Sequence, residues 1–237
     1  MSNLIAWHND PQLKRDTLAK MRAHRDADEL LQGNGYWENG KGCAVGCLIQ
    51  GGNHLEYELR FGIPKMLAWF EDLIFENLLR NTAQLWPELF LDSIEVGADL
   101  SCVGWLFLRD MMRDISIPKS DDFANILCRE VIKSSAELMD LYARGFHDLR
   151  AVEAAKNLAL QARFVTLENR VFTFATLVAW QVADFAAFRT KSSTDRIIHL
   201  FAKCAQSDDP ATMERAYQRM SDTLIKHIVQ AEKVAIS

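Results

Sequence analysis

Apolar side chains recur at steps of three and four residues between Met66 and Leu78, and this spacing constrains the fold more than any other feature of the chain. The set is Met66, Leu67, Phe70, Leu73, Ile74 and Leu78. Because an α-helix has about 3.6 residues per turn, these side chains share one face. Ile63-Pro64 stands directly before the set, and proline is favoured at the first position of a helix. The segment therefore predicts an amphipathic helix packed on a core.

Helix-start signals recur along the rest of the chain. Asp10-Pro11 and Asp209-Pro210 combine a side chain that accepts free N–H groups with a proline that has the right backbone angle. The chain holds 11 Gly and 5 Pro, and it has few alternating β-branched runs. These signals predict an all-α fold with about ten helices and no strand. The expected ranges are 10–32, 43–49, 54–61, 63–78, 86–96, 100–112, 120–143, 148–165, 168–189, 194–204 and 210–234.

A linker that contains Pro118 marks the expected division of the chain. It separates an N-terminal helical unit, residues 1–115, from a C-terminal helical bundle, residues 116–237, on which it packs, although one continuous domain fits the length equally well. The segment from Phe172 to Phe188 is apolar around most of its circumference, so we expect it at the centre of the bundle.

The charge distribution argues against binding to nucleic acid. The net charge is −5, and residues 1–115 carry 11 Lys and Arg against 17 Asp and Glu. Residues 116–237 carry 16 against 15, and neither part contains a block of basic residues. Nucleic-acid binding depends on clustered cations that displace counterions, so we expect no nucleic-acid partner.

The apolar segments and the cysteines indicate a cytoplasmic protein. The first residues show no apolar stretch behind a basic start, so we expect no signal peptide. The most apolar run is interrupted by Gln181 and Asp184, which makes it too polar to cross a membrane. Five cysteines, an odd number without disulfide-rich spacing, fit a reducing compartment.

The glycine-rich stretch that follows Gly33 holds the candidate site. If Gly42-Cys43 opens a helix, the Cys43 thiol lies at the positive end of the helix dipole, where a cysteine can become a nucleophile. His54 or His24 is then the candidate base, with Asp28 or Glu58 as the acid that orients it. A simpler alternative is that Cys43 and Cys47 are small buried residues on one helix face. Gly46 weakens such a helix, which suggests that another backbone passes close to it.

Metal and anion sites are the other chemical interpretations of this stretch. Three pairs stand four residues apart and could each present two ligands on one face, namely Cys43 and Cys47, His24 and Asp28, and His54 and Glu58. Neither a CxxC nor an HExxH motif is present, so we expect no metal and no cofactor. The loop from Gly33 to Gly42 lacks a phosphate-loop pattern, but its candidate binding residues are Tyr36, Trp37, Lys41 and the nearby Cys47.

The same region carries a combination of short motifs. They are GCAVGC from Gly42 to Cys47, His54, Tyr57-Glu58, GIP from Gly62 to Pro64 and LAWFEDLIFENL from Leu67 to Leu78, preceded by His24, Ala27 and Asp28. In this combination, over about residues 10–100, the chain resembles a family of uncharacterised bacterial and phage-associated proteins. Many members look rich in alanine and repetitive beyond residue 115, and this chain does not. The resemblance implies family membership and no activity.

Two hypotheses for the function follow. The first is a non-enzymatic binding or assembly protein that forms a homodimer through apolar helix faces, with a small-molecule ligand left open. The alternative is an enzyme that uses Cys43 as its nucleophile, with His54 or His24 as base, on a small acyl or thiol substrate. The two hypotheses differ in whether Cys43 faces a pocket or the core.

Overall fold

The computed structural model describes residues 4–33, 35–165, 170–204 and 210–233. Within these residues the chain forms eleven α-helices, one short 3-10 helix and two strands of two residues each, which confirms the all-α class. Contacts divide the chain into two compact units, which are described separately below. Among the described helices, none combines the length and the apolar character that a bilayer crossing demands.

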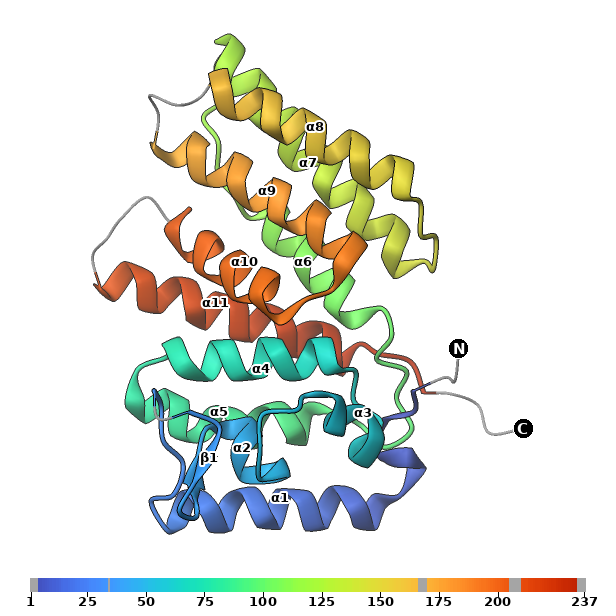
Figure 1. Cartoon of the computed structure of the whole chain (residues 1–237), viewed down its shortest axis with the longest axis vertical. Helices are drawn as coiled ribbons and strands as arrows, with labels where there is room; N and C mark the ends of the chain where they lie inside the picture. Colours follow the sequence, from blue (N-terminus) through green and yellow to red (C-terminus); the bar gives the residue numbers. More distant parts are fainter. Residues whose placement is uncertain (1–3, 34, 166–169, 205–209, 234–237) are drawn as a thin grey trace. The chain divides into compact units, whose positions relative to one another are not determined.

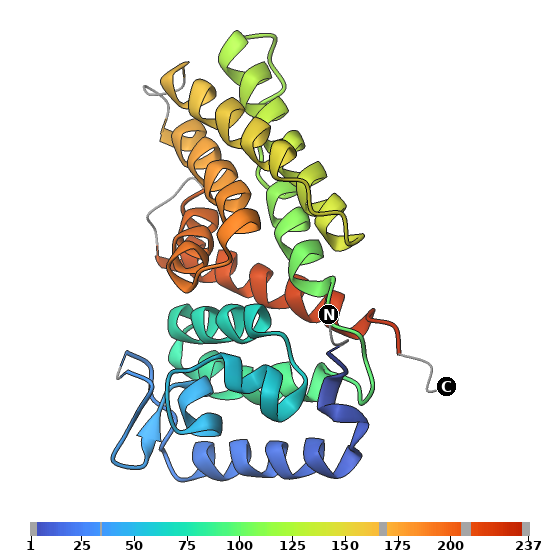
Figure 2. The same ribbon diagram turned by 45° about the vertical axis from the view of Figure 1, so that its right-hand side comes forward.

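The first unit contains the whole glycine-rich stretch. Its elements are η1 (Ala6–Asn9), α1 (Pro11–Asp26), β1 (Trp37–Glu38), β2 (Lys41–Gly42), α2 (Ala44–Ile49), α3 (Leu55–Phe61), α4 (Lys65–Asn77) and α5 (Arg80–Ser93). Helices α2 and α5 each contact both α1 and α4, so they lie between those two helices (Figures 1 and 2). The predicted amphipathic helix is α4, and its apolar side chains Leu67, Phe70 and Ile74 are fully buried. It therefore forms one wall of the core that surrounds the candidate site.

The second unit contains α6 (Val103–Arg113), α7 (Phe123–Ala143), α8 (Leu149–Val165), α9 (Arg170–Phe188), α10 (Lys191–Lys203) and most of α11 (Pro210–Val229). Helix α9 contacts α7, α8 and α10 (Figure 1). Its residues Ala175, Val178, Ala179, Val182 and Ala183 are fully buried. The central position predicted for this segment within the bundle is confirmed.

The boundaries between the two units fall at other positions in the sequence than the expected linker. The second unit spans Gly104–Thr223, and the first takes up the chain again from Leu224. In the first unit, the backbone N–H of Asp99 donates to the Glu232 carbonyl at 2.9 Å, and Lys233 pairs with Glu95 at 2.5 Å. The Pro118 linker lies inside the second unit, because Arg109 of α6 pairs with Asp140 of α7 at 2.9 Å.

Several helix boundaries differ from the expected ones. Helix α5 begins at Arg80 instead of Trp86 and takes Pro87 into its interior, since Ala83 in its first turn already packs in the core. Helix α10 begins with Thr190 as its cap, because Ser193 and Thr194 are buried inside the helix. Helix α1 ends at Asp26, well before residue 32. The expected helix starts at residues 168 and 209 lie outside the described residues.

A short β-hairpin replaces the expected strand-free loop. Strands β1 and β2 pair in antiparallel register, with Trp37 opposite Gly42 and Glu38 opposite Lys41. The two residues between them, Asn39 and Gly40, both have positive φ, at 51° and 83°. Asn-Gly is the preferred pair for such a tight turn, so the prediction of no strand was wrong although the sequence carries the signal.

Candidate functional site

Three glycines of the candidate site make room for Tyr36. A Cβ atom built on Gly46 would lie 1.4 Å from the Tyr36 carbonyl oxygen, and one on Gly42 would lie 1.9 Å from the same atom. A Cβ on Gly52 would lie 2.4 Å from Cδ2 of the Tyr36 ring. The close backbone approach predicted at Gly46 is therefore confirmed, and it fixes the Tyr36 segment of the loop against α2.

Cys43 is the N-cap residue of α2, as its predicted place at the helix start requires. Its Sγ accepts a hydrogen bond from the backbone N–H of Gly46 at 3.4 Å. The side chain is buried, and this burial, with the negative charge of Asp72 as the next cause, raises the pKa of the Cys43 thiol well above its usual value. The effect of burial on the thiol pKa thus outweighs the opposite effect of the helix N-terminus. A protonated, buried thiol does not favour the nucleophile hypothesis.

His54 is buried and faces two acceptors. Its Nδ1 lies 3.0 Å from the Gly52 carbonyl oxygen, and its Nε2 lies 3.3 Å from Oδ2 of Asp72. Because a carbonyl oxygen can only accept, Nδ1 carries the hydrogen in this contact. With its hydrogen on Nδ1, a neutral ring would turn the lone pair of Nε2 toward a carboxylate oxygen. Such a contact is stable only with a proton or another cation between the two atoms.

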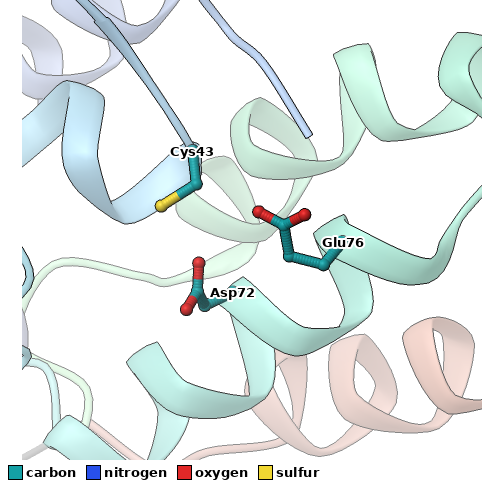
Figure 3. Close-up of side chains that lie close together, drawn as sticks. All are labelled: Cys43, Asp72 and Glu76. Carbon is teal, nitrogen blue, oxygen red and sulfur yellow. The ribbon is translucent and has the colours of Figure 1, made fainter. Parts of the chain in front are cut away.

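Asp72 and Glu76 bring two carboxylates to Cys43. They stand four residues apart on α4, so they lie on one face of the helix. The Sγ atom of Cys43 and one oxygen of each carboxylate all lie within 4.8 Å of one another (Figure 3). Oε2 of Glu76 also accepts a hydrogen bond from the backbone N–H of Gly33 at 2.6 Å, which ties the glycine-rich loop to α4.

A third carboxyl group, Glu71, is fully buried beside this group. Its Oε2 lies 3.4 Å from the Tyr57 hydroxyl, and its Oε1 has no hydrogen-bond partner in the described part of the chain. Burial first, and the charge of Asp72 second, raise the pKa of the Glu71 carboxyl well above its usual value. Below, "the Cys43 cluster" means the side chains of Cys43, His54, Tyr57, Glu71, Asp72 and Glu76.

Of the predicted catalytic residues, only Cys43 and His54 belong to the Cys43 cluster. His24 pairs instead with Glu29, at 2.6 Å between Nδ1 and Oε2. Asp28 is exposed in the turn after α1. Oε1 of Glu58 accepts the backbone N–H of Lys65 at 2.9 Å and so caps α4. The acid that faces His54 is Asp72, which was not among the candidates.

The predicted binding residues are also divided. The Tyr36 ring meets the His54 ring edge-on, with centroids 5.4 Å apart, and so covers one side of the Cys43 cluster. The Trp37 ring lies edge-on to His24, at 5.5 Å. Cys47 is buried, with Sγ 3.6 Å from the Gly42 carbonyl oxygen, and Lys41 is exposed on β2. Of this set, Tyr36 is the residue whose ring packs against a side chain of the cluster.

The sequence carried a signal for the residues that were missed. Glu71 stands four residues after Leu67 and three before Ile74, which places a carboxyl group on the apolar stripe of α4. A charged residue in such a stripe needs a partner in the core, and that requirement points to a buried polar cluster.

The cluster offers a thiol, carboxylates and an imidazole, which are the donor groups of metal centres in proteins. His54 does not serve as a direct base for Cys43, because both of its ring nitrogens are engaged elsewhere. Comparisons of the chain with protein-family models, with curated proteins and with solved structures found no match.

Proposed function

We propose that the first unit binds a divalent transition-metal ion through Cys43, His54, Asp72 and Glu76. The observation that carries this proposal is the convergence of the Cys43 thiol with two carboxylates, all within 4.8 Å, at a largely buried position. The proposal departs from the expectation that the chain holds no metal. It specifies a metal ion as the ligand in the hypothesis of a binding protein.

The charge balance of the Cys43 cluster supports a cation. Three carboxyl groups and a thiol stand against one imidazole, and of these only Glu76 is partly exposed. Uncompensated negative charge is too costly in such a place, so protons must neutralise the cluster when no cation is bound. The raised pKa values of the Cys43 thiol and the Glu71 carboxyl agree with this, because both groups then keep their protons and stay neutral. A divalent cation would neutralise the cluster more directly, because one ion offsets two negative charges.

The orientation of His54 supports its role as a ligand. A metal-bound histidine commonly donates its second ring N–H to a backbone carbonyl, and Nδ1 of His54 has such a partner in Gly52. Its Nε2 then presents a lone pair 3.3 Å from Oδ2 of Asp72. Donor atoms around a tetrahedral zinc ion lie about 3.5 Å apart, given metal–ligand distances of about 2.0–2.3 Å. Cys43, Asp72 and Glu76, whose donor atoms lie within 4.8 Å of one another, therefore need shifts of about 1 Å to enclose an ion of this kind, and the His54 ring must approach them from its contact with Asp72.

Cobalt(II) tests the proposal directly, because a thiolate bound to cobalt absorbs in the near ultraviolet. We expect this absorption to appear when the full chain is titrated with Co²⁺, and to disappear in Cys43→Ser. Serine keeps the hydrogen bond that caps α2 but lacks the thiolate, so the variant should fold. We expect its Co²⁺ affinity to fall about tenfold or more, as for the loss of other groups that hold a metal.

Cys47→Ser is the matched control, since Cys47 is buried on the same helix and lies outside the Cys43 cluster. It should keep the absorption. An unchanged spectrum in Cys43→Ser, or no absorption in the natural chain, would refute the metal site. The rate of reaction with iodoacetamide distinguishes the metal-ligand hypothesis from the nucleophile hypothesis. A catalytic Cys43 must react faster than a free model thiol, and a buried ligand must react more slowly.

A homodimer is the second part of the proposal, supported by an uncovered apolar pair on α5. Leu85 and Leu89 stand one turn apart and are 59% and 51% exposed. We expect sedimentation equilibrium at micromolar concentration to give the mass of two chains, and the double variant Leu85→Lys, Leu89→Lys to give the mass of one. Leu59→Lys on α3, where Leu59 is 64% exposed, is the control and should leave the dimer intact. A single-chain mass for the natural protein would contradict this assignment.

We also propose a cytoplasmic location and membership of the family of uncharacterised bacterial and phage-associated proteins. All five cysteines are free, which supports a reducing compartment. The close approach of Tyr36 to Gly42 and Gly46 supplies a structural reason for the GCAVGC motif on which the family resemblance rests.

A further inference from the structure

The second unit contains a cavity that has no part in the proposed metal site. It lies between α8, α9 and α10 and has a volume of about 430 Å³. Sites for small molecules commonly have volumes of about 300–1,000 Å³ and mostly apolar walls. Here the apolar wall includes Leu160, Leu177 and Leu200. The cavity is therefore large enough and apolar enough to take the body of a small ligand.

The charges around the cavity are of one sign. Arg163 of α8 and Arg196 of α10 both line it, and no Asp or Glu does so among the described residues. In the described part of the chain, no ion pair of Arg196 is formed. The nearby cation Lys156, by contrast, is already paired with Asp184 at 2.7 Å. The positive charge of Arg196 is thus available to a negatively charged ligand group.

Trp180 contributes a third feature. It lines the cavity, and its indole Nε1 has no hydrogen-bond partner among the described residues. A buried donor without a partner is unfavourable, and tryptophan normally finds an acceptor when it is buried. An acceptor on a bound molecule would supply one, while the indole ring offers a flat apolar surface to the rest of that molecule.

We propose that this cavity binds an amphipathic carboxylate, with the carboxylate at Arg163 and Arg196 and the apolar body along Leu177, Trp180 and Leu200. Arginine suits this head group, because its planar guanidinium donates two parallel hydrogen bonds to a carboxylate. An uncharged chain of the same length would fill the apolar part and leave the charge of Arg196 without a counter-charge. The cavity should therefore distinguish the two by charge.

Calorimetric titration of the full chain with dodecanoate below its micelle concentration tests the proposal, with dodecanol as the uncharged probe. We expect dodecanoate to bind, and Arg196→Gln to weaken its binding about tenfold, which corresponds to about 1.4 kcal/mol. Arg163→Gln should weaken it similarly. Arg150→Gln is the control, because Arg150 lies on α8, does not line the cavity and is 98% exposed. It should leave the affinity unchanged.

Three outcomes would overturn the assignment. The first is no binding of dodecanoate to the natural chain. The second is equal binding of dodecanol and dodecanoate, which would mean that the arginines do not recognise the head group. The third is equal dodecanoate affinity in Arg196→Gln, Arg163→Gln and the control. Because these arginines are exposed, their variants should fold, and unchanged thermal unfolding will verify that they do.

Discussion

Replacing Gly46 by alanine is expected to destabilise the protein by about 3 kcal/mol or more, the upper range for overpacking a core. The added Cβ would lie 1.4 Å from the Tyr36 carbonyl oxygen, which is a backbone atom and cannot rotate away. Helix propensity alone predicts the opposite sign, since alanine is favoured over glycine inside a helix by about 1 kcal/mol. The experiment therefore decides between local preference and tertiary packing.

Urea unfolding, followed by circular dichroism, measures this effect. Gly51→Ala is the matched control, because nothing lies within 4 Å of a Cβ built on Gly51. Its midpoint should change little, whereas that of Gly46→Ala should fall sharply or the first unit should fail to fold. If Gly46→Ala unfolds at the same urea concentration as the natural chain or a higher one, the close approach of Tyr36 is wrong.

The Co²⁺ affinity of the Cys43 cluster is expected to rise about 100-fold between pH 6 and pH 8. Burial raises the pKa of the Cys43 thiol, so the thiol is protonated throughout this range when no metal is bound. A metal ion binds the thiolate and must displace that proton. Each proton displaced makes the apparent affinity rise about tenfold per pH unit. The sign is thus positive: affinity increases as pH rises and protons become scarcer.

Titrations at several pH values measure this slope, and Cys43→Ser shows whether the thiol causes it. Serine carries no proton that a metal must displace in this range, so the slope should fall by about one proton. Cys47→Ser should keep the slope of the natural chain. An affinity that does not change with pH would show that Cys43 is not bound as a thiolate, even if some metal binds elsewhere.

The local features of the fold could be predicted from the sequence because they depend on neighbours along the chain. Asp10 caps α1 by accepting the backbone N–H of Gln12 at 2.7 Å, as the Asp-Pro signal predicts. Cys43 stands at the start of α2, and Gly62 ends α3 with a positive φ of 65°. Periodicity also identified α4 as a core helix and α9 as the centre of its bundle. Each of these predictions needs only a few consecutive residues.

The candidate site could be predicted only in part, because its contacts join different helices. Spacing of four residues suggested Glu58 as the partner of His54, but Glu58 caps α4 and the partner is Asp72. Eighteen residues separate His54 from Asp72, and no periodic pattern specifies that contact. His24 is held by Glu29, which belongs to the turn after α1. Side-chain pairing across helices follows from packing, which one sequence does not reveal.

The contact between Tyr36 and the glycines also determines which properties can be inferred for a homologue that shares the motif. The two glycines of the motif GCAVGC, Gly42 and Gly46, are explained by the room that they leave for a neighbouring backbone. A homologue that shares this motif should therefore share the path of the loop. Whether it shares the proposed metal site also depends on positions 54, 72 and 76, which lie outside the motif. Sequence searches that rely on GCAVGC will thus group proteins by architecture, and the residues at positions 54, 72 and 76 will identify those that also share the proposed metal site.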